Sequence, residues 1–135
     1  MPEISVIVPI FNEEANLEKL HARLTGVMQQ LGKTYEMVLV NDGSKDRSME
    51  LIRGLAAQDS HVRYICFSRN FGHQIAVTAG LEACLGKRAV IIDGDLQDPP
   101  ELILEMDAKM DEGFEVVYAK RRQRKGESWL KKATA

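Results

Sequence analysis

The chain has 135 residues, of which 44% are hydrophobic and 28% charged, and its formal net charge is −2. This length allows one domain with a real hydrophobic core, and the composition is ordinary for a soluble protein. No apolar run approaches the roughly 18–20 residues that are needed to cross a bilayer, so a membrane-spanning segment within the chain is excluded.

Short apolar segments alternate with segments of helical periodicity from the start of the chain. The apolar segments are rich in β-branched residues, which is typical of strands buried on both faces. The predicted strands span residues 4–10, 35–40, 62–67, 89–93 and 114–118. The predicted helices begin after Asn12, after Ser44 or Asp46, at about His73 and at Pro99–Pro100. Residues such as Asn and Ser suit helix caps, and proline suits a first turn.

This alternation of strands and helices predicts an α/β fold. Its three α/β/α layers contain a mostly parallel sheet with helices on both faces. Residues 126–135 begin a further helix-like pattern, and the chain ends within it. We therefore expect the chain to be a fragment of a longer protein.

The charge is unevenly distributed along the chain. Residues 1–119 carry 11 Lys and Arg against 19 Asp and Glu, whereas residues 120–135 carry 7 against 1. A basic end on an acidic body indicates contact with an anion, which could be phosphate, nucleic acid or a lipid surface. A solvated basic helix face would have the same composition. We divide the chain here into a core, residues 1–119, and a basic segment, residues 120–135.

Polar residues follow each of the first four predicted strands. They are Asn12–Glu14, Asp42–Ser44, Arg69–Asn70, and Asp93 with Asp95 and Gln97. Because the carboxyl ends of parallel strands share one edge of a sheet, these clusters should converge there on a ligand. Turns are rich in such residues in any protein, so the convergence indicates a site and a single loop does not.

The segment Asp93-Gly94-Asp95 is the most distinctive of these clusters. Two carboxylates so close together repel each other unless a cation lies between them. Hard divalent ions such as Mg²⁺ take oxygen ligands and usually keep substrate phosphates in their shell. The segment therefore predicts a metal that carries a diphosphate. The sequence contains no glycine-rich phosphate loop, so cations such as Arg69 or Arg121 would help to hold the phosphates.

A nucleotide could bind at the same edge. Asp42 could accept a hydrogen bond from a base or a ribose, and Pro9 would let backbone groups face a base. The alternatives are an Asx-turn for Asp42 and a surface ion pair for Arg69. His73 follows Gly72 at a predicted helix start, and we expect a capping or solvated role for it, although it could approach the site.

Four segments in order resemble the family 2 glycosyltransferases. They are Val8–Glu14, Asn41–Ser44, Arg69–Gly72 and Asp93–Glu101. Within that family the chain looks most like the polyprenyl-phosphate sugar transferases, of the dolichol-phosphate mannose synthase and bactoprenol-phosphate glucosyltransferase type. The resemblance implies a GT-A fold, whose Rossmann-like half binds a nucleotide sugar.

The resemblance also implies roles for individual residues. The positions that match nucleotide-sugar contacts are Pro9, Glu13, Asp42, Arg69 and Asp93. The positions that match the Mg²⁺ or Mn²⁺ motif are Asp93, Asp95 and Gln97. The implied catalytic set is Asp93, Asp95 and Arg121, the last lying near a family arginine that touches phosphate. The chain has Gly94 where relatives often have alanine.

The function implied is inverting, metal-dependent transfer of a sugar from a nucleotide sugar, with UDP-glucose favoured, to a polyprenyl phosphate. The alternatives are a glycan or other hydroxyl acceptor, a non-catalytic nucleotide-sugar-binding module and a phosphoacceptor signalling domain. A nucleic-acid partner is not implied, and a homo-oligomer is compatible with the sequence.

The basic segment also predicts contact with a membrane. Trp129 and Leu130 beside Lys131 and Lys132 predict the start of an interfacial amphipathic helix. A helix that packs on another part of the same domain is the alternative. We expect the full-length protein at the cytoplasmic face of the plasma membrane, in contact with it through a region beyond residue 135. The 135-residue chain alone is expected to be soluble, and by itself it could bind the donor but fail to transfer the sugar.

Overall fold

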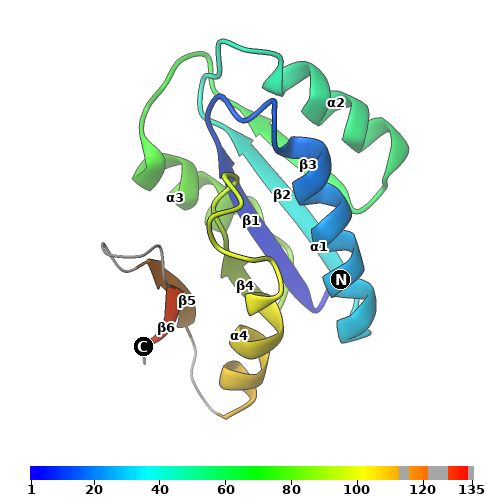
Figure 1. Cartoon of the computed structure of the whole chain (residues 1–135), viewed down its shortest axis with the longest axis vertical. Coiled ribbons are helices and arrows are strands. Elements are labelled where there is room, and N and C mark those ends of the chain that lie inside the picture. The colour runs from blue at the N-terminus through cyan, green and yellow to red at the C-terminus, as the bar shows by residue number, and fades with distance from the viewer. Residues whose placement is uncertain (113–115, 122–127, 134–135) are drawn as a thin grey trace.

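The computed structural model describes residues 1–112, 116–121 and 128–133. Helices and strands alternate over the first 111 residues and are followed by two further strands (Figure 1). In chain order they are β1 (Ile4–Ile10), α1 (Leu17–Leu31), β2 (Tyr35–Asn41), α2 (Ser48–Gln58), β3 (Val62–Cys66), α3 (His73–Ala83), β4 (Arg88–Ile91), α4 (Leu102–Asp111), β5 (Val116–Arg121) and β6 (Ser128–Ala133).

Strands β1 to β4 form one parallel sheet in the order β3-β2-β1-β4. β1 pairs with β2 from Ile4↔Tyr35 to Ile10↔Asn41, and on its other side it pairs with β4. All seven residues of β1 are buried, as expected for a central strand covered on both faces. From β1 the chain adds β2 and then β3 on one side, and it then crosses back to add β4 on the other side of β1. The direction in which strands are added therefore reverses, and the switch point lies between β1 and β4. Ligands of open α/β sheets bind at such a reversal.

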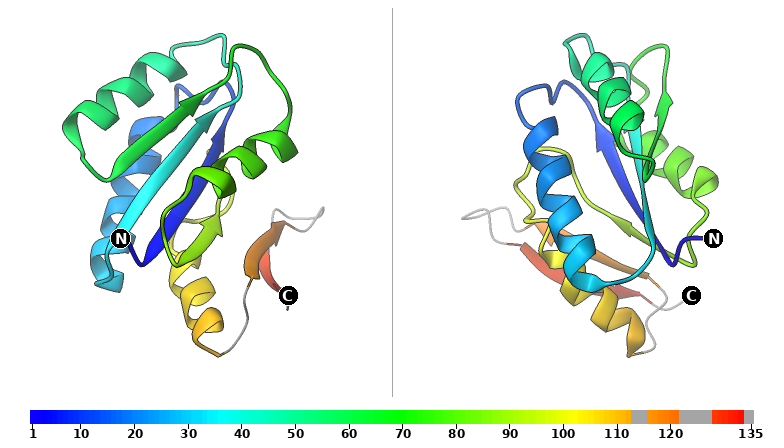
Figure 2. Two further views of the ribbon diagram at one scale, coloured as in Figure 1. Left: turned by 180° about the vertical axis from the view of Figure 1, so that it is seen from behind. Right: turned by 90° about the vertical axis from the view of Figure 1, so that its right-hand side faces the viewer.

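Helices cover both faces of this sheet, which confirms the three-layer fold. α1, α2 and α4 lie on one face and α3 on the other (Figure 2). On the first face Val6 and Val8 of β1 belong to a core that includes Leu20 of α1. On the second face Ile7 packs with Ala76 of α3. Right-handed crossovers explain this arrangement, since reversing the direction of travel between β3 and β4 moves the connecting helix to the opposite face.

The last two strands differ from what the sequence predicts. β5 does not extend the parallel sheet, because it pairs antiparallel with β6 in a separate two-stranded sheet, from Val116↔Ala133 to Arg121↔Ser128. The prediction of an amphipathic helix at residues 126–135 is wrong for residues 128–133, which form β6. A helix of fewer than about 12 residues is marginal by itself, so backbone pairing with β5 prevails over a short helical pattern. Among the described residues, no helix is long and apolar enough to span a bilayer.

The first helix begins later than predicted. α1 starts at Leu17, and Asn12 is not its cap, since Asn12 lies in the left-handed region with φ 54°. For α2, Asp46 rather than Ser44 accepts the backbone N–H of Ser48, the first residue of the helix, at 2.9 Å. The residues that precede both helices are thus free of regular structure and form loops beside the ends of β1 and β2.

Candidate functional site

A cavity of about 430 Å³ lies where β1, β2 and β4 end. Five of the predicted site residues line it, and they come from three different strand ends: Pro9, Glu13, Asp42, Asp93 and Asp95. The cavity therefore lies at the reversal of strand order, where an open α/β sheet places its ligand.

The loop after β1 is held in place by the loop after β2. The N–H of Asn12 donates to Ser44 Oγ at 2.9 Å, and Asn12 Oδ1 accepts the N–H of Lys45 at 2.8 Å. The N–H of Glu13 donates to Ser48 Oγ at 2.9 Å. These bonds tie the two loops together, and they use Asn12 on the neighbouring loop, so it does not cap α1.

Asp42 is buried, and its carboxylate accepts hydrogen bonds from one loop of three residues. Asn70 Nδ2 donates to Oδ2 at 3.0 Å, and the N–H of Phe71 donates to Oδ1 at 2.7 Å. The N–H of Gly72 reaches Oδ2 at 3.1 Å. The Asx-turn considered for Asp42 is not what its carboxylate forms; in the turn after β2 it is Asn41 Oδ1 that accepts an N–H, that of Ser44 three residues on, at 3.1 Å. Asp42 thus fixes the loop that leads into α3.

Gly43 allows this loop to approach. Its φ is +71°, and an added Cβ would lie 2.2 Å from the carbonyl carbon of Arg69 and 2.3 Å from the nitrogen of Asn70. Glycine adopts positive φ without the steric cost that a side chain brings. The close packing of the 69–72 loop on the turn after β2 therefore requires glycine at this position.

The two aspartates after β4 each accept a hydrogen bond inside the cavity region. Asp93 Oδ1 lies 2.8 Å from His73 Nε2, and Asp95 Oδ1 accepts the N–H of Gln97 at 3.0 Å. Leu96, between Asp95 and Gln97, has φ 63°. Positive φ at a residue other than glycine costs free energy and is found preferentially at functional sites. The turn that orients Asp95 is therefore a strained one.

Negative charge accumulates around the cavity. Burial raises the pKa of Glu13 above its ordinary value, although a side-chain hydrogen bond from Asn16 lowers it. The charges of Asp95, Asp46 and Asp93 raise it further. Like charges at close range oppose ionisation, so a cation at this position would relieve the repulsion.

The residues present fit a hard divalent cation. Asp93, Asp95 and Glu13 bring carboxylate oxygens to one cavity, and oxygen is the ligand that Mg²⁺ and Mn²⁺ prefer. Within the described part of the chain, no three His, Cys, Asp or Glu side chains are arranged to hold a metal together. Such a site would therefore use one or two carboxylates and leave the remaining positions to water and ligand phosphate, which is usual for Mg²⁺.

Two predicted residues do not line the cavity, and the side chain of a third is not described. The guanidinium of Arg69 stacks 4.6 Å from the centroid of the Phe71 ring, and Arg69 does not line the cavity. Gln97 contributes a backbone N–H to Asp95 and does not line the cavity either. Arg121 lies in β5, and its side chain falls outside the described residues.

Asn70, Gly72 and His73 also line the cavity. Asn70 belongs to one of the strand-end clusters that the sequence predicts to converge there, whereas no specific role at the site was predicted for Gly72 or His73. A capping role for His73 is wrong, because the cap residue of α3 is Gly72. The alternative, that His73 approaches the site, is confirmed, since its ring contacts Asp93. The only signal in the sequence was the position of His73 directly after a strand-end loop. Its contact with Asp93 depends on how α3 docks on the sheet.

Comparison with known proteins places this geometry in a family. The model of glycosyl transferase family 2 matches residues 5–134. The chain is 55% identical over 133 residues to the glycosyltransferase YkcC of Bacillus subtilis (strain 168), covering 98% of this chain and 41% of that protein. It is 43% identical over 122 residues to the undecaprenyl-phosphate 4-deoxy-4-formamido-L-arabinose transferase of Shewanella sediminis (strain HAW-EB3), covering 90% of this chain and 37% of that protein. The chain thus spans about two fifths of the length of these relatives.

Solved structures share the fold. TarS 1-349 of S. aureus in complex with UDP-GlcNAc has a TM-score of 0.63 at 19% identity, over 83% of this chain and 32% of that one. The mannosyltransferase PcManGT of Pyrobaculum calidifontis, in complex with GDP-Man and Mn²⁺, has a TM-score of 0.60 at 23% identity, over 70% and 28%. At this level of identity the likeness concerns the arrangement of the backbone alone.

Proposed function

The chain belongs to glycosyl transferase family 2, and from this premise we propose that it transfers a sugar, with inversion, from a nucleotide sugar to a polyprenyl phosphate. UDP-glucose is the favoured donor. The lipid acceptor is supported by the relative from Shewanella sediminis, which is named as an undecaprenyl-phosphate transferase. In this proposal the full-length protein works at the cytoplasmic face of the plasma membrane.

One observation carries the proposal: the cavity at the ends of β1, β2 and β4 is lined by carboxylates. Among the described lining residues, Glu13, Asp42, Asp93 and Asp95 are acidic, and none is Lys or Arg. A diphosphate would be repelled by such a lining unless a cation accompanied it. A donor that enters with Mg²⁺ or Mn²⁺ resolves this conflict, and the named complex of PcManGT contains both a nucleotide sugar and Mn²⁺.

The residues of the chain would share the work as follows. Asp93 and Asp95 would bind the cation, with Gln97 holding Asp95 through its backbone N–H, and Pro9 and Glu13 would face the nucleoside. When bound, the metal would act as a Lewis acid on the departing diphosphate. Arg121 in β5 would add positive charge at the phosphates, where charge develops as the bond to the sugar breaks.

The acceptor explains why the cavity needs no strong base. The oxygen of a phosphate monoester is already anionic near neutral pH, so it can attack the anomeric carbon without losing a proton first. A hydroxyl acceptor would need a general base near the sugar. Transfer assays with undecaprenyl phosphate and with an oligosaccharide, on the protein at its full natural length, distinguish these two acceptors.

Thermal unfolding with sugar nucleotides tests the donor and the metal together. A ligand that binds only the folded state stabilises it, by about 2.7 kcal/mol at a concentration of 100 times its Kd. We expect UDP-glucose to raise the melting temperature of this chain when Mn²⁺ is present and to have little effect in EDTA.

Asp95→Asn should abolish both this stabilisation and sugar transfer without unfolding the chain. The matched control is Glu105→Gln, which removes one negative charge from an exposed position of α4 outside the cavity. Stabilisation of Asp95→Asn equal to that of the unmodified chain would refute the metal assignment. Binding without transfer in the full-length protein would favour a non-catalytic nucleotide-sugar module.

A further inference from the structure

We propose that His73 is a positioning residue that orients Asp93 for metal binding, an inference that rests on the proposed function. Its imidazole Nε2 lies 2.8 Å from Asp93 Oδ1, although the two residues are 20 positions apart in the chain. Both residues line the cavity. The contact joins the start of α3 to the end of β4, so it depends on tertiary structure and not on a local turn.

The start of α3 is fixed firmly enough to hold the ring in place. Gly72, with φ +107°, turns the chain into the helix, and its N–H donates to the buried carboxylate of Asp42. One turn into the helix, Ala76 is buried against the sheet beside Ile7. The position of His73 is therefore set on both sides, by the hydrogen-bonded loop before it and by the packed helix after it.

The chemistry of the contact suits an outer-sphere partner of a metal ligand. An imidazole N–H that donates to one carboxylate oxygen favours the ionised carboxylate and restricts its rotation, and hydrogen-bonded partners of this kind tune metal sites. A carboxylate has two oxygens, so a hydrogen bond on Oδ1 is compatible with coordination of a metal by the same group. Asp95 is oriented by a backbone N–H, that of Gln97, whereas Asp93 receives this bond from a side chain.

This difference makes the role of His73 testable by substitution. Replacing Gln97 leaves its backbone N–H in place, whereas replacing His73 removes the imidazole donor to Asp93. His73→Leu deletes the donor and keeps an apolar body, His73→Ala deletes the ring, and His73→Gln supplies another N–H donor. The side chain of His73 is 61% exposed, so none of these changes opens a packed core.

The experiment measures Mn²⁺ binding to this chain by the electron paramagnetic resonance signal of free Mn²⁺, in the presence of UDP. We expect His73→Leu and His73→Ala to weaken Mn²⁺ binding by about tenfold or more, which is typical for loss of an outer-sphere partner, and His73→Gln to restore most of it. The melting temperature and the urea midpoint of the metal-free chain should stay unchanged. A merely structural role would alter these last two quantities along with the metal affinity.

Two outcomes would overturn the inference, and they differ in what else they overturn. If the unmodified chain binds Mn²⁺, Asp93→Asn loses it and His73→Leu keeps it, then His73 does not position Asp93, while the proposed function stands. If the folded, unmodified chain binds no Mn²⁺ with or without UDP, the metal-dependent function fails, and the role of His73 fails with it.

Discussion

Asp42 is a buried carboxylate whose hydrogen-bonding capacity is used within the protein. Its side chain accepts bonds from Asn70, Phe71 and Gly72, and its exposed fraction is only 4%. A buried charge of this kind is tolerated because several N–H donors satisfy it. The structure therefore supports a role for Asp42 in holding the loop before α3, in addition to the nucleotide contact that the family resemblance implies.

Replacing Asp42 should destabilise the protein through this loop. In Asp42→Ala the backbone N–H groups of Phe71 and Gly72 lose their acceptor, and a buried donor without a partner costs about 1–3 kcal/mol. Asp42→Asn keeps one acceptor oxygen and should lose less. Urea unfolding measures both differences, with the exposed-site variant Glu105→Gln as control. An unchanged urea midpoint for Asp42→Ala would show that the loop is held by other contacts.

At the scale of elements, the docking of α3 on the sheet depends on Gly80. A Cβ at this position would lie 2.4 Å from Ile7 Cγ2 and 3.3 Å from Val40 Cγ2, so the helix backbone lies directly on β1 and β2. The γ-methyl group of a β-branched side chain is stiff and cannot move aside easily. This close approach sets the height of α3 above the sheet and hence the position of His73 at the edge of the cavity.

Gly80→Ala should therefore destabilise the protein, although alanine is the better helix former. We expect a loss of about 1–3 kcal/mol from overpacking against Ile7. Gly54→Ala in α2 is the matched control, because nothing lies within 4 Å of its added Cβ, and it should stabilise by about 0.5–1 kcal/mol. Chemical denaturation of both variants gives the comparison. If both variants are stabilised alike, α3 does not rest on the sheet at Gly80.

The same scale shows how far the sequence alone could predict the structure. β1 and β2 were predictable because buried strands read as nearly continuous apolar runs. The convergence of Glu13 and Asp93 follows from parallel pairing. The first residue of α1 could not be predicted, because the side chain of Asn12 does not cap this helix but accepts the N–H of Lys45 in the loop after β2. The contact of His73 with Asp93 and the pairing of β6 with β5 also required tertiary information. A local sequence pattern does not indicate which residue, distant in the chain, a polar group will bond in the folded protein.

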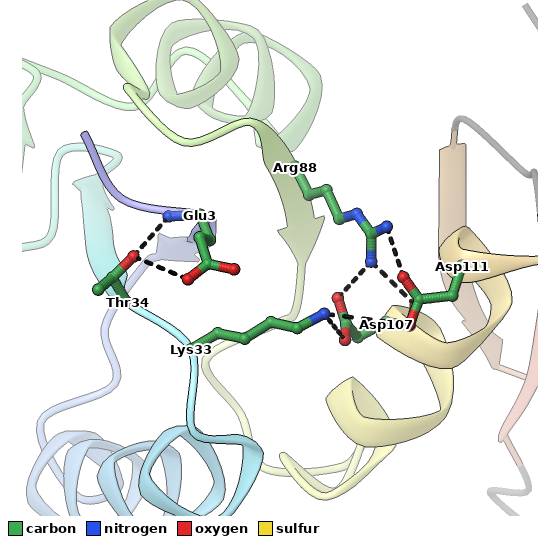
Figure 3. Close-up of polar contacts among 6 residues, drawn as sticks. All are labelled: Glu3, Lys33, Thr34, Arg88, Asp107 and Asp111. Carbon is green, nitrogen blue, oxygen red and sulfur yellow. Dashed lines mark hydrogen bonds and ion pairs between the residues drawn. The ribbon is translucent and has the colours of Figure 1, made fainter.

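At the scale of the whole molecule, buried carboxylates lie at both ends of the sheet but in opposite environments. At the amino ends of the strands, Asp107 of α4 receives Lys33 Nζ at 2.6 Å and Arg88 Nη1 at 2.7 Å (Figure 3). These contacts join the turn between α1 and β2, the start of β4 and helix α4. At the carboxyl ends, around the cavity, the charges of Asp95, Asp46 and Asp93 raise the pKa of Glu13. Acidic groups are thus balanced by Lys and Arg at one end of the sheet, whereas like charges lie near one another at the other end.

Glu36 of β2 is a carboxylate whose hydrogen bonds stabilise the folded state. Burial raises its pKa, but hydrogen bonds from Ser5, from the N–H of Leu85 and from Arg63 outweigh burial and hold the pKa below the ordinary value of 4.5. Ser5 Oγ and Leu85 N each lie 2.6 Å from Oε2, and Arg63 Nη1 lies 2.7 Å from Oε1. These bonds connect three strands and the loop after α3 through one side chain.

The pH dependence of stability should separate the two kinds of carboxylate. A lowered pKa in the folded state means that the stability from Glu36 is present above its unfolded pKa and is lost as pH falls through the folded value. The raised pKa of Glu13 has the opposite sign, so Glu13 opposes folding near neutral pH and this cost is relieved on acidification. Calorimetry across the acidic range should therefore show that Glu36→Gln is less stable than the unmodified chain near neutral pH, by about 1–3 kcal/mol, and that its stability is less sensitive to acid.

Glu13→Gln should melt about 2 °C higher than the unmodified chain near neutral pH without metal. This gain should vanish at low pH, where Glu13 is protonated in both the folded and the unfolded state. Parallel melting curves for both variants at every pH would contradict the assigned environments.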